Sequence, residues 1–260
     1  MSKSEERLVT RVAYKEQVSY ARVLENKRIQ LLEGDPITGF SETSVILEEG
    51  TFQYLPPVSA TKIVGIGKNY PEGEETVTEP NLTPSFFLMG PNAMTAHQST
   101  TKLPPVFKSV LVEGELGVVI KKQARNLKPS DVQDVILGYT IVNDFSGRDS
   151  FLEKVPAAVK KSSDGFAPIG PYLNLNPELR DFEIKTLIDG KVVQSGNTKD
   201  MLSNIVQCLC YITSIMTLEP FDVVSTGTPT PKPKLWPGQT VQVEISELGT
   251  LENSLEANDA

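Results

Sequence analysis

Short apolar segments in which polar and apolar residues alternate recur along the chain, separated by turn residues. Alternation with a period of two predicts strands, because successive side chains of a strand point to opposite faces of the sheet. The strands predicted in this way are 8–14, 18–23, 28–32, 110–120, 135–142, 182–188, 223–226 and 240–245. A turn is predicted at 33–36, and Asp189-Gly190 predicts a two-residue hairpin turn. The pattern therefore predicts a mostly β fold of mixed α+β class.

Two segments have the spacing of a helix. Residues 128–135 open with Pro129-Ser130-Asp131, which favours a helix N-terminus. Residues 200–216 carry apolar side chains three and four positions apart and include the chain's two cysteines, Cys208 and Cys210. Positions i and i+2 of a helix point about 200° apart, so these thiols cannot form a mutual disulfide or share a metal within the helix. We interpret both cysteines as packing residues.

The patterns before and after Pro56-Pro57 differ. Residues 7–55 alternate short strands with turns, whereas the longer strands and both predicted helices follow residue 62. A chain of 260 residues is long enough for one large and one small domain. We expect a small N-terminal β-rich domain at 1–57 and a larger domain at 58–260.

The net charge of the chain limits the classes of partner that it is expected to bind. A net charge of −8 and a pI near 4.9 argue against nucleic acid, which rewards basic surfaces. The first residues lack the apolar core of a signal peptide, and no apolar run approaches the length of a membrane span. We therefore expect a cytoplasmic protein with no nucleic-acid or membrane partner.

The main candidate for chemistry is a pair of glutamates, Glu113 and Glu115, inside an otherwise apolar segment. Alternate residues of a strand share one face, and two like charges on a half-buried face are costly unless a cation lies between them. A solvated strand face is the common alternative for a Glu-x-Glu pair. Asp144, which closes the predicted strand at 135–142, adds a third carboxylate. Three carboxylates form an all-oxygen set that suits a hard cation such as Mg²⁺ or Mn²⁺.

Several short motifs occur in a characteristic order after residue 62. They are residues 62–70, 84–88, 113–116, 138–144, 148–149, 161–171, 194–198, 226–229 and 237–239. In this order the segment 62–255 resembles the catalytic domain of the fumarylacetoacetate hydrolase family. The resemblance implies the family's mixed β-roll, a small N-terminal β domain and a homodimer.

The resemblance also implies a metal centre. Two glutamates and an aspartate bind a divalent cation in that family, and Glu113, Glu115 and Asp144 match them. The family chelates a 2-oxo acid or its enol on the metal, which stabilises the enolate formed when a C–C or C–H bond breaks. Lys161 matches a lysine that neutralises substrate or enolate charge; its alternative is a surface lysine beside Lys160.

Further matched positions imply contacts to the substrate. Thr228, in a tight Gly-Thr-Pro turn, would offer a hydroxyl or backbone N–H to a carboxylate. Gln194 is a weaker candidate, and Asn69 and Tyr70 belong to the first matched segment. Arg148 would hold a substrate carboxylate, or would pair instead with an acidic neighbour, Asp149 or Glu153.

The chain differs from the hydrolytic members of the resembled family, in which the motif Asn-Tyr-x-x-His is followed by a glutamate. Gly73 stands where that histidine would be, so Glu72, Glu74 or Glu75 would have to supply a carboxylate base, and we select Glu72 and Glu75 as catalytic candidates. The single histidine, His97, lies in another segment, and we interpret it as structural. Met89 replaces a common lysine and suggests a more apolar substrate.

Three hypotheses follow. The first is a metal-dependent decarboxylase or keto-enol or double-bond isomerase of a 2-oxo acid or diketone, because neither reaction needs an attacking water; Asp164-Gly165-Phe166 resembles that branch. The second is a C–C hydrolase of acylpyruvates or fumarylacetoacetate-like substrates. The third is an inactive binding homologue, or a biosynthetic enzyme that acts on a larger ketone.

Overall fold

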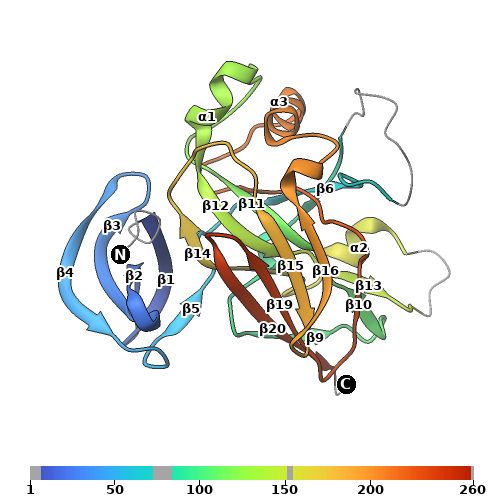
Figure 1. The fold of residues 1–260 in the computed structure, drawn as a ribbon, viewed down its shortest axis with the longest axis horizontal. Coiled ribbons are helices and arrows are strands. Elements are labelled where there is room, and N and C mark those ends of the chain that lie inside the picture. Colours follow the sequence, from blue (N-terminus) through green and yellow to red (C-terminus); the bar gives the residue numbers. More distant parts are fainter. Residues whose placement is uncertain (1–6, 73–83, 151–154, 259–260) are drawn as a thin grey trace.

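Strands are the main regular elements of the computed structural model, which describes residues 7–72, 84–150 and 155–258 (Figure 1). The first five strands are β1 (Leu8–Tyr14), β2 (Gln17–Val23), β3 (Ile29–Asp35), β4 (Gly39–Leu47) and β5 (Gln53–Leu55). The next nine are β6 (Ile63–Gly67), β7 (Ser85–Met89), β8 (Met94–Thr95), β9 (Thr100–Leu103), β10 (Ser109–Leu111), β11 (Gly114–Ile120), β12 (Ile136–Asn143), β13 (Ser146–Arg148) and β14 (Ala167–Asn174). The last six are β15 (Glu183–Ile188), β16 (Lys191–Asn197), β17 (Val223–Ser225), β18 (Lys234–Leu235), β19 (Thr240–Ile245) and β20 (Gly249–Ala257). The helices are α1 (Val132–Val135), α2 (Ala157–Lys161) and α3 (Ile205–Ile215).

One large sheet runs through the molecule in the order β4-β3-β2-β1-β14-β12-β11-β17-β6-β7. The strands β15, β16, β19, β20 and β9 form a second sheet, and β13, β10 and β18 form a third. The pairing of β17 with β6 is parallel, and most other pairs are antiparallel. The prediction of a mostly β fold is confirmed.

The N-terminal strands lie to one side of the other sheets in Figure 1. They enclose an apolar cluster of their own that contains Val12, Ala21, Ile29, Leu47, Phe52 and Tyr54. Their sheet nevertheless continues into the rest of the protein, because β1 pairs with β14 at Leu8↔Asn174 and Val9↔Leu173. A boundary at residue 57 therefore divides one continuous sheet, and it also cuts an apolar cluster in which Val9 and Leu32 pack with residues that follow it. The two-domain description stays a prediction.

Three of the predicted elements differ clearly in their bounds from the observed ones, and several strands, β14 among them, were not predicted. The turn expected at 33–36 lies instead at 36–38, because β3 continues to Asp35, whose carboxylate accepts the N–H groups of Ile37 and Thr38. The helix expected from residue 200 begins at Ile205, where the Asn204 side chain accepts the N–H of Gln207. The strand expected at 110–120 is interrupted between β10 and β11.

That interruption shapes the candidate site. Val112 donates its N–H to the carbonyl of Pro233, and Asp144 donates its N–H to the carbonyl of Glu113. Because these bonds replace the regular strand pairing, Glu113 lies between β10 and β11 rather than inside one strand. Glu115 remains in β11, where it pairs with Val142.

The strands β11 and β12 are buried along their whole length. Leu116, Val118 and Ile120 of β11 contribute to one apolar cluster, whereas Val119 and Val142 contribute to another. Both clusters therefore cover these strands, and the alternation places Glu115 on the same side as Val119 and Val142. In the part of the chain that the structure describes, no helix is long and apolar enough to cross a membrane.

A buried carboxylate joins the start of β6 to the turn before β17. Asp222 is fully buried, and it accepts hydrogen bonds from Thr61 N (3.1 Å), Thr61 Oγ1 (2.7 Å), Lys62 N (3.1 Å) and Glu219 N (2.8 Å). Its Oδ2 atom, which accepts the Glu219 N–H, also pairs with the Lys62 ammonium. We predict that Asp222→Ala lowers the free energy of unfolding by about 3–5 kcal/mol, because several buried donors lose their acceptor.

Urea denaturation measures this effect, with Lys27→Gln as the control. The Lys27–Glu49 pair (3.1 Å) is exposed, and its loss should cost less than about 1 kcal/mol. Equal losses in the two variants would contradict the assignment of Asp222 as a structural anchor.

Candidate metal centre

Three carboxylates and one lysine meet at the ends of β11 and β12. One oxygen from each of Glu113, Glu115 and Asp144 can be chosen so that all three lie within 4.8 Å of one another, and all three residues are buried. Glu115 follows Gly114 at the start of β11, and Asp144 follows the last residue of β12. The antiparallel pairing of these strands, Gly114 opposite Asn143, brings the two ends together. The structure therefore gathers the three carboxylates that the sequence pattern singled out.

Lys161 supplies the positive charge closest to this triad. It is the last residue of α2, and its ammonium lies 2.7 Å from Asp144 Oδ2 and 3.1 Å from Glu113 Oε1. The ammonium also lies over the ring of Phe87 at 5.4 Å. Burial alone would lower the pKa of Lys161, but the charges of Asp144 and Glu113 outweigh it and raise that pKa above its ordinary value. Lys161 is therefore a buried cation rather than the surface lysine that the sequence left open.

Two donors fix one oxygen of Glu115. Ser225 Oγ donates to Glu115 Oε2 at 2.6 Å, and the Gly227 N–H donates to the same oxygen at 2.8 Å. Gly227 has φ +94°, and a Cβ there would lie 2.8 Å from the Cβ of Asn69, so the turn that presents this N–H requires glycine. The sequence analysis missed Ser225, because a serine near the end of a strand carries no distinctive signal.

The contacts of the three carboxylates do not fully compensate their negative charge. Burial, followed by the charges of Asp144 and Glu113, raises the pKa of Glu115 to about 8, and burial raises the pKa of Asp144 to about 7. The Oδ1 atom of Asp144 is buried and has no hydrogen-bond partner. A buried, unpaired carboxylate oxygen beside two further carboxylates is what an oxygen-preferring divalent cation would satisfy. The donor set therefore fits Mg²⁺ or Mn²⁺.

Tyr70 and Thr228 lie close to the surroundings of Glu115, because the charge of Glu115 acts on Tyr70 and Thr228 directly follows Gly227, which donates to Glu115. The Tyr70 hydroxyl is buried without a hydrogen-bond partner, and burial together with the Glu115 charge raises the pKa of Tyr70. Thr228 is buried, and its Oγ1 accepts a hydrogen bond from Gln194 Nε2 at 3.1 Å. Gln194 Nε2 also donates to the carbonyl groups of Pro229 (2.5 Å) and Pro231 (2.8 Å). Gln194 thus holds the turn that carries Thr228.

The remaining candidates have other contacts. The Asn69 amide donates to the carbonyls of Ser203 (3.0 Å) and Thr226 (2.8 Å) and accepts the Ser203 N–H (2.8 Å), so its polar atoms are engaged with backbone. Arg148 donates to Ser146 Oγ and to the Gly147 carbonyl. Glu72 is exposed and lies 3.8 Å from the Lys232 ammonium. Glu75 lies outside the described residues, as do Gly73, Glu74 and Glu153.

Two residues outside the triad bear on the sequence interpretation. Met89 has no exposed surface and packs in the core with Ile63 and Val223, so it gives no reason to expect a more apolar substrate. The His97 ring packs edge-on against Tyr54, and His97 Nδ1 accepts the N–H of Glu252 at 3.0 Å. Burial lowers the pKa of His97 to about 4, so the imidazole is neutral at pH 7.

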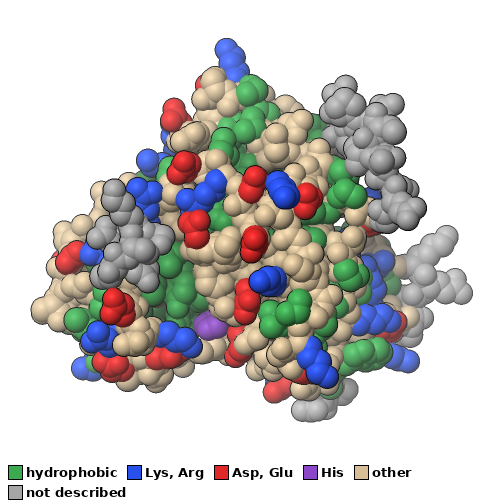
Figure 2. All heavy atoms as spheres, viewed as in Figure 1, with side chains coloured by type: hydrophobic (Ala, Val, Ile, Leu, Met, Phe, Trp, Pro, Cys, Tyr) green, Lys and Arg blue, Asp and Glu red, His purple; other side chains and the backbone are tan. Residues whose placement is uncertain are grey.

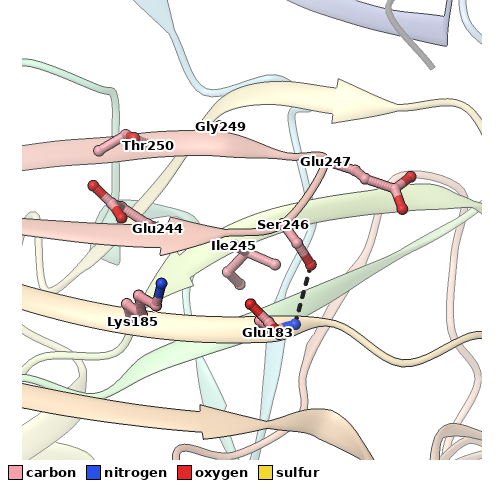
Figure 3. Close-up of a pocket in the computed structure, with 8 residues that line it drawn as sticks. All are labelled: Glu183, Lys185, Glu244, Ile245, Ser246, Glu247, Gly249 and Thr250. Atoms are coloured by element: carbon pink, nitrogen blue, oxygen red, sulfur yellow. Dashed lines mark hydrogen bonds between the residues drawn. The ribbon is translucent and has the colours of Figure 1, made fainter. Parts of the chain in front are cut away.

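A separate hollow of about 420 Å³ lies on strands β15, β19 and β20, with Lys185 between Glu183 and Glu244 (Figure 3). At its edge Glu247 pairs with Arg180 at 2.9 Å. None of the triad residues lines it. Figure 2 shows acidic and basic side chains interspersed over the face seen in Figure 1. We interpret this hollow as a solvated strand face of mixed charge.

The sequence has relatives of known fold and family. Residues 62–256 match the family described as fumarylacetoacetate (FAA) hydrolase C-terminal. An uncharacterized protein of Archaeoglobus fulgidus is 37% identical over 203 residues, which cover 78% of this chain and 81% of that protein. The 4-hydroxyphenylacetate degradation bifunctional isomerase/decarboxylase of Salmonella dublin is 34% identical over 206 residues, 76% of this chain but only 48% of the relative, so this chain spans about half of that protein.

Solved structures share the fold over almost the whole chain. The 2-hydroxyhepta-2,4-diene-1,7-dioate isomerase from Mycobacterium marinum matches with a TM-score of 0.85 at 27% identity and covers 98% of this chain and all of its own. A maleylpyruvate hydrolase from Sphingobium sp. SYK-6, solved in complex with manganese(II) and pyruvate, matches with a TM-score of 0.78 at 20% identity, over 96% of this chain and 100% of its own. The latter similarity shows the fold alone.

The triad predicts a pH dependence of stability in the metal-free protein. The pKa values of Glu115 and Asp144 are raised in the folded state, which therefore binds more protons than the unfolded state between about pH 4 and 8. The stability contribution of the triad falls as the pH rises through this window. We predict that, as the pH rises from 5 to 8, the free energy of unfolding of Glu115→Gln increases by roughly 2–5 kcal/mol relative to that of wild type.

Urea denaturation at several pH values measures this difference, and contributions common to both proteins, including that of His97, cancel. The exposed Glu183→Gln is the matched control and should follow the wild-type curve. Adding Mn²⁺ should stabilise wild type more at pH 8 than at pH 6, because bound carboxylates must be deprotonated. Parallel curves for Glu115→Gln and wild type would contradict the assignment.

Proposed function

This chain belongs to the fumarylacetoacetate hydrolase family, and on that premise we propose that it is a divalent-metal-dependent decarboxylase or isomerase of a small 2-oxo acid or diketone. The observation that carries the proposal is the buried set of three converging carboxylates, with an unpaired oxygen on Asp144 and a lysine beside them. Three buried carboxylates that share only the one ammonium of Lys161 would be destabilising without a further cation, which argues against a purely structural role.

Glu113, Glu115 and Asp144 would hold Mg²⁺ or Mn²⁺, both of which prefer carboxylate oxygens. When bound, the cation would supply Lewis-acid polarisation of a substrate oxygen. The bonds from Ser225 and Gly227 hold Oε2 of Glu115, which leaves its other oxygen to face the cation.

Lys161, Tyr70 and Thr228 would act on the substrate. The Lys161 ammonium would attract a substrate carboxylate and stabilise negative charge that develops on a nearby substrate oxygen. The unpartnered Tyr70 hydroxyl would donate a hydrogen bond to the substrate, since a buried hydroxyl without a partner is otherwise costly. Thr228 would orient a carboxylate, with Gln194 acting through the turn that it holds.

Decarboxylation or isomerisation is favoured over hydrolysis because the chain lacks a histidine at the position of the general base that would activate water. Gly73 stands where hydrolytic members would carry the histidine that activates the attacking water. The lone pair of His97 Nδ1 already accepts the Glu252 N–H, and burial lowers the pKa of His97 to about 4, which makes it a weak base. Losing CO₂ or moving a double bond needs no attacking water. The isomerase/decarboxylase relative supports the same direction. A C–C hydrolase in which Glu72 or Glu75 serves as base is the second candidate, and a homodimer belongs to the proposal as an expectation from the family.

We predict that metal-stripped protein regains activity with Mn²⁺ or Mg²⁺ on unsaturated 2-oxo acids, and that products followed by NMR show CO₂ loss or double-bond migration. Acylpyruvates are included as hydrolase substrates. Two fragments from an acylpyruvate would establish the hydrolase instead. Metal binding without turnover of any compound would favour an inactive or biosynthetic homologue, and no metal binding would refute the proposal.

We also predict that Lys161→Met lowers kcat by about 10²–10³-fold, because a charge aimed at the reacting oxygen is lost. Its affinity for Mn²⁺, measured by calorimetry, should not fall, since removal of the ammonium frees Asp144 and Glu113. Lys160→Met in the same helix is the control and should keep wild-type kcat. A normal rate in Lys161→Met would exclude this lysine from the reaction.

A further inference from the structure

The segment from Thr228 to Pro233 is fixed beside the carboxylate triad at both ends. Gln194 Nε2 binds Thr228 Oγ1 and the carbonyls of Pro229 and Pro231. At the other end the Pro233 carbonyl accepts the N–H of Val112 at 2.9 Å, and Val112 directly precedes Glu113. Lys232 lies between these anchors, so its backbone is held close to the segment that carries one triad carboxylate.

Thr230 and Lys232 also connect this segment to residues 71 and 72. Thr230 Oγ1 donates to the Pro71 carbonyl at 3.3 Å, and the Lys232 ammonium lies 3.8 Å from Glu72 Oε1. These residues directly follow Tyr70, whose buried hydroxyl feels the charge of Glu115. Lys232 is thus placed between the interior of the site and the solvent: its side chain is 25% exposed, against 10% for Lys161.

Lys232 and Lys234 differ in how closely an acidic side chain pairs with their ammonium groups. Lys234 lies 2.9 Å and 3.0 Å from the two carboxylate oxygens of Asp149, and its ammonium also lies over the Trp236 ring. The Lys232 side chain is less exposed than that of Lys234 (25% against 44%), but its acidic partner Glu72 is 3.8 Å away, beyond hydrogen-bond distance, and 57% exposed. A partly buried lysine with a loosely held counter-charge favours an incoming anion.

The charge of Lys232 also reaches the triad. Burial raises the pKa of Asp144, and the charges of Lys161 and, more weakly, Lys232 oppose that rise. Lys161 contacts the triad directly and would attract the end of the substrate that binds there. Lys232 is the more solvent-exposed of these two cations, and it is suited to the opposite end of the same molecule.

We propose that Lys232 is a specificity-determining residue whose ammonium binds an anionic group at the end of the substrate remote from the three carboxylates, and that Glu72 occupies this ammonium until the substrate arrives. This inference rests on the proposed function, because it assumes that a 2-oxo acid binds at the triad. It implies that a 2-oxo acid with a second, distal carboxylate binds better than one that ends in a methyl group.

The test compares 2-oxoadipate with 2-oxohexanoate, which have the same chain length and differ in the distal group. Binding of each to the Mn²⁺-loaded protein is measured by calorimetry. We expect wild type to prefer the diacid by about tenfold, a typical size for one partly desolvated charge pair. Lys232→Gln should lose this preference while its affinity for the monoacid stays unchanged, and Lys232→Arg should keep most of it.

Two further variants separate a specific subsite from general electrostatics. Lys234→Gln removes the same charge from the same segment and should keep the tenfold preference. Glu72→Gln removes the competing carboxylate and should raise affinity for the diacid alone. A preference that survives in Lys232→Gln, or that is lost equally in Lys234→Gln, would overturn the inference, as would equal affinities in wild type. Binding of Mn²⁺ with no binding of either acid would instead refute the proposed function, and the role of Lys232 with it.

Discussion

Burying three like charges in one place is the constraint on which the rest of this structure depends. Glu113, Glu115 and Asp144 repel one another in a region of low dielectric, and each needs a compensating contact. Lys161 serves two of them, and the Ser225 hydroxyl with the Gly227 N–H serves the third. These partners compensate incompletely, because one oxygen of Asp144 is left without any. The folded protein therefore retains repulsion between these carboxylates, which a bound divalent cation would reduce.

The compensating groups come from segments that are distant in sequence but adjacent in the fold. The strands β12, β11 and β17 lie side by side in the large sheet. Asp144 directly follows β12, Glu115 lies at the start of β11, and β17 leads into the turn from Ser225 to Gly227. The helix α2 brings Lys161 from outside the sheet and contacts β7 and β13. The order of strands in the sheet thus brings the charged residues together, while the other contacts to them come from loops and one short helix.

Periodicity predicted some of the strands, including β11 and β12, and two members of the triad at their ends, although it missed others such as β14. A buried strand shows its period directly, and Glu115 and Asp144 lie at strand ends that pairing brings together. The position of Glu113 outside the strand depends on hydrogen bonds to Pro233 and Asp144, which no local pattern contains. The helix α2 has only five residues, too few for a period, so Lys161 was found through a motif. The interpretation of Met89 rested on a difference from the resembled family, and such a difference does not tell whether the side chain lies in the core, as Met89 does.

The single histidine and the two cysteines have a consequence for which ions the protein acquires in a cell. Copper, nickel and zinc outcompete manganese and magnesium wherever imidazole or thiolate ligands are offered. Here the imidazole of His97 packs against Tyr54, and burial raises the pKa of the Cys208 thiol to about 12, so it is not a thiolate. A centre that offers these ions only carboxylates gives them their smallest advantage. Resistance to mismetallation would then come from ligands that the chain keeps away from the centre.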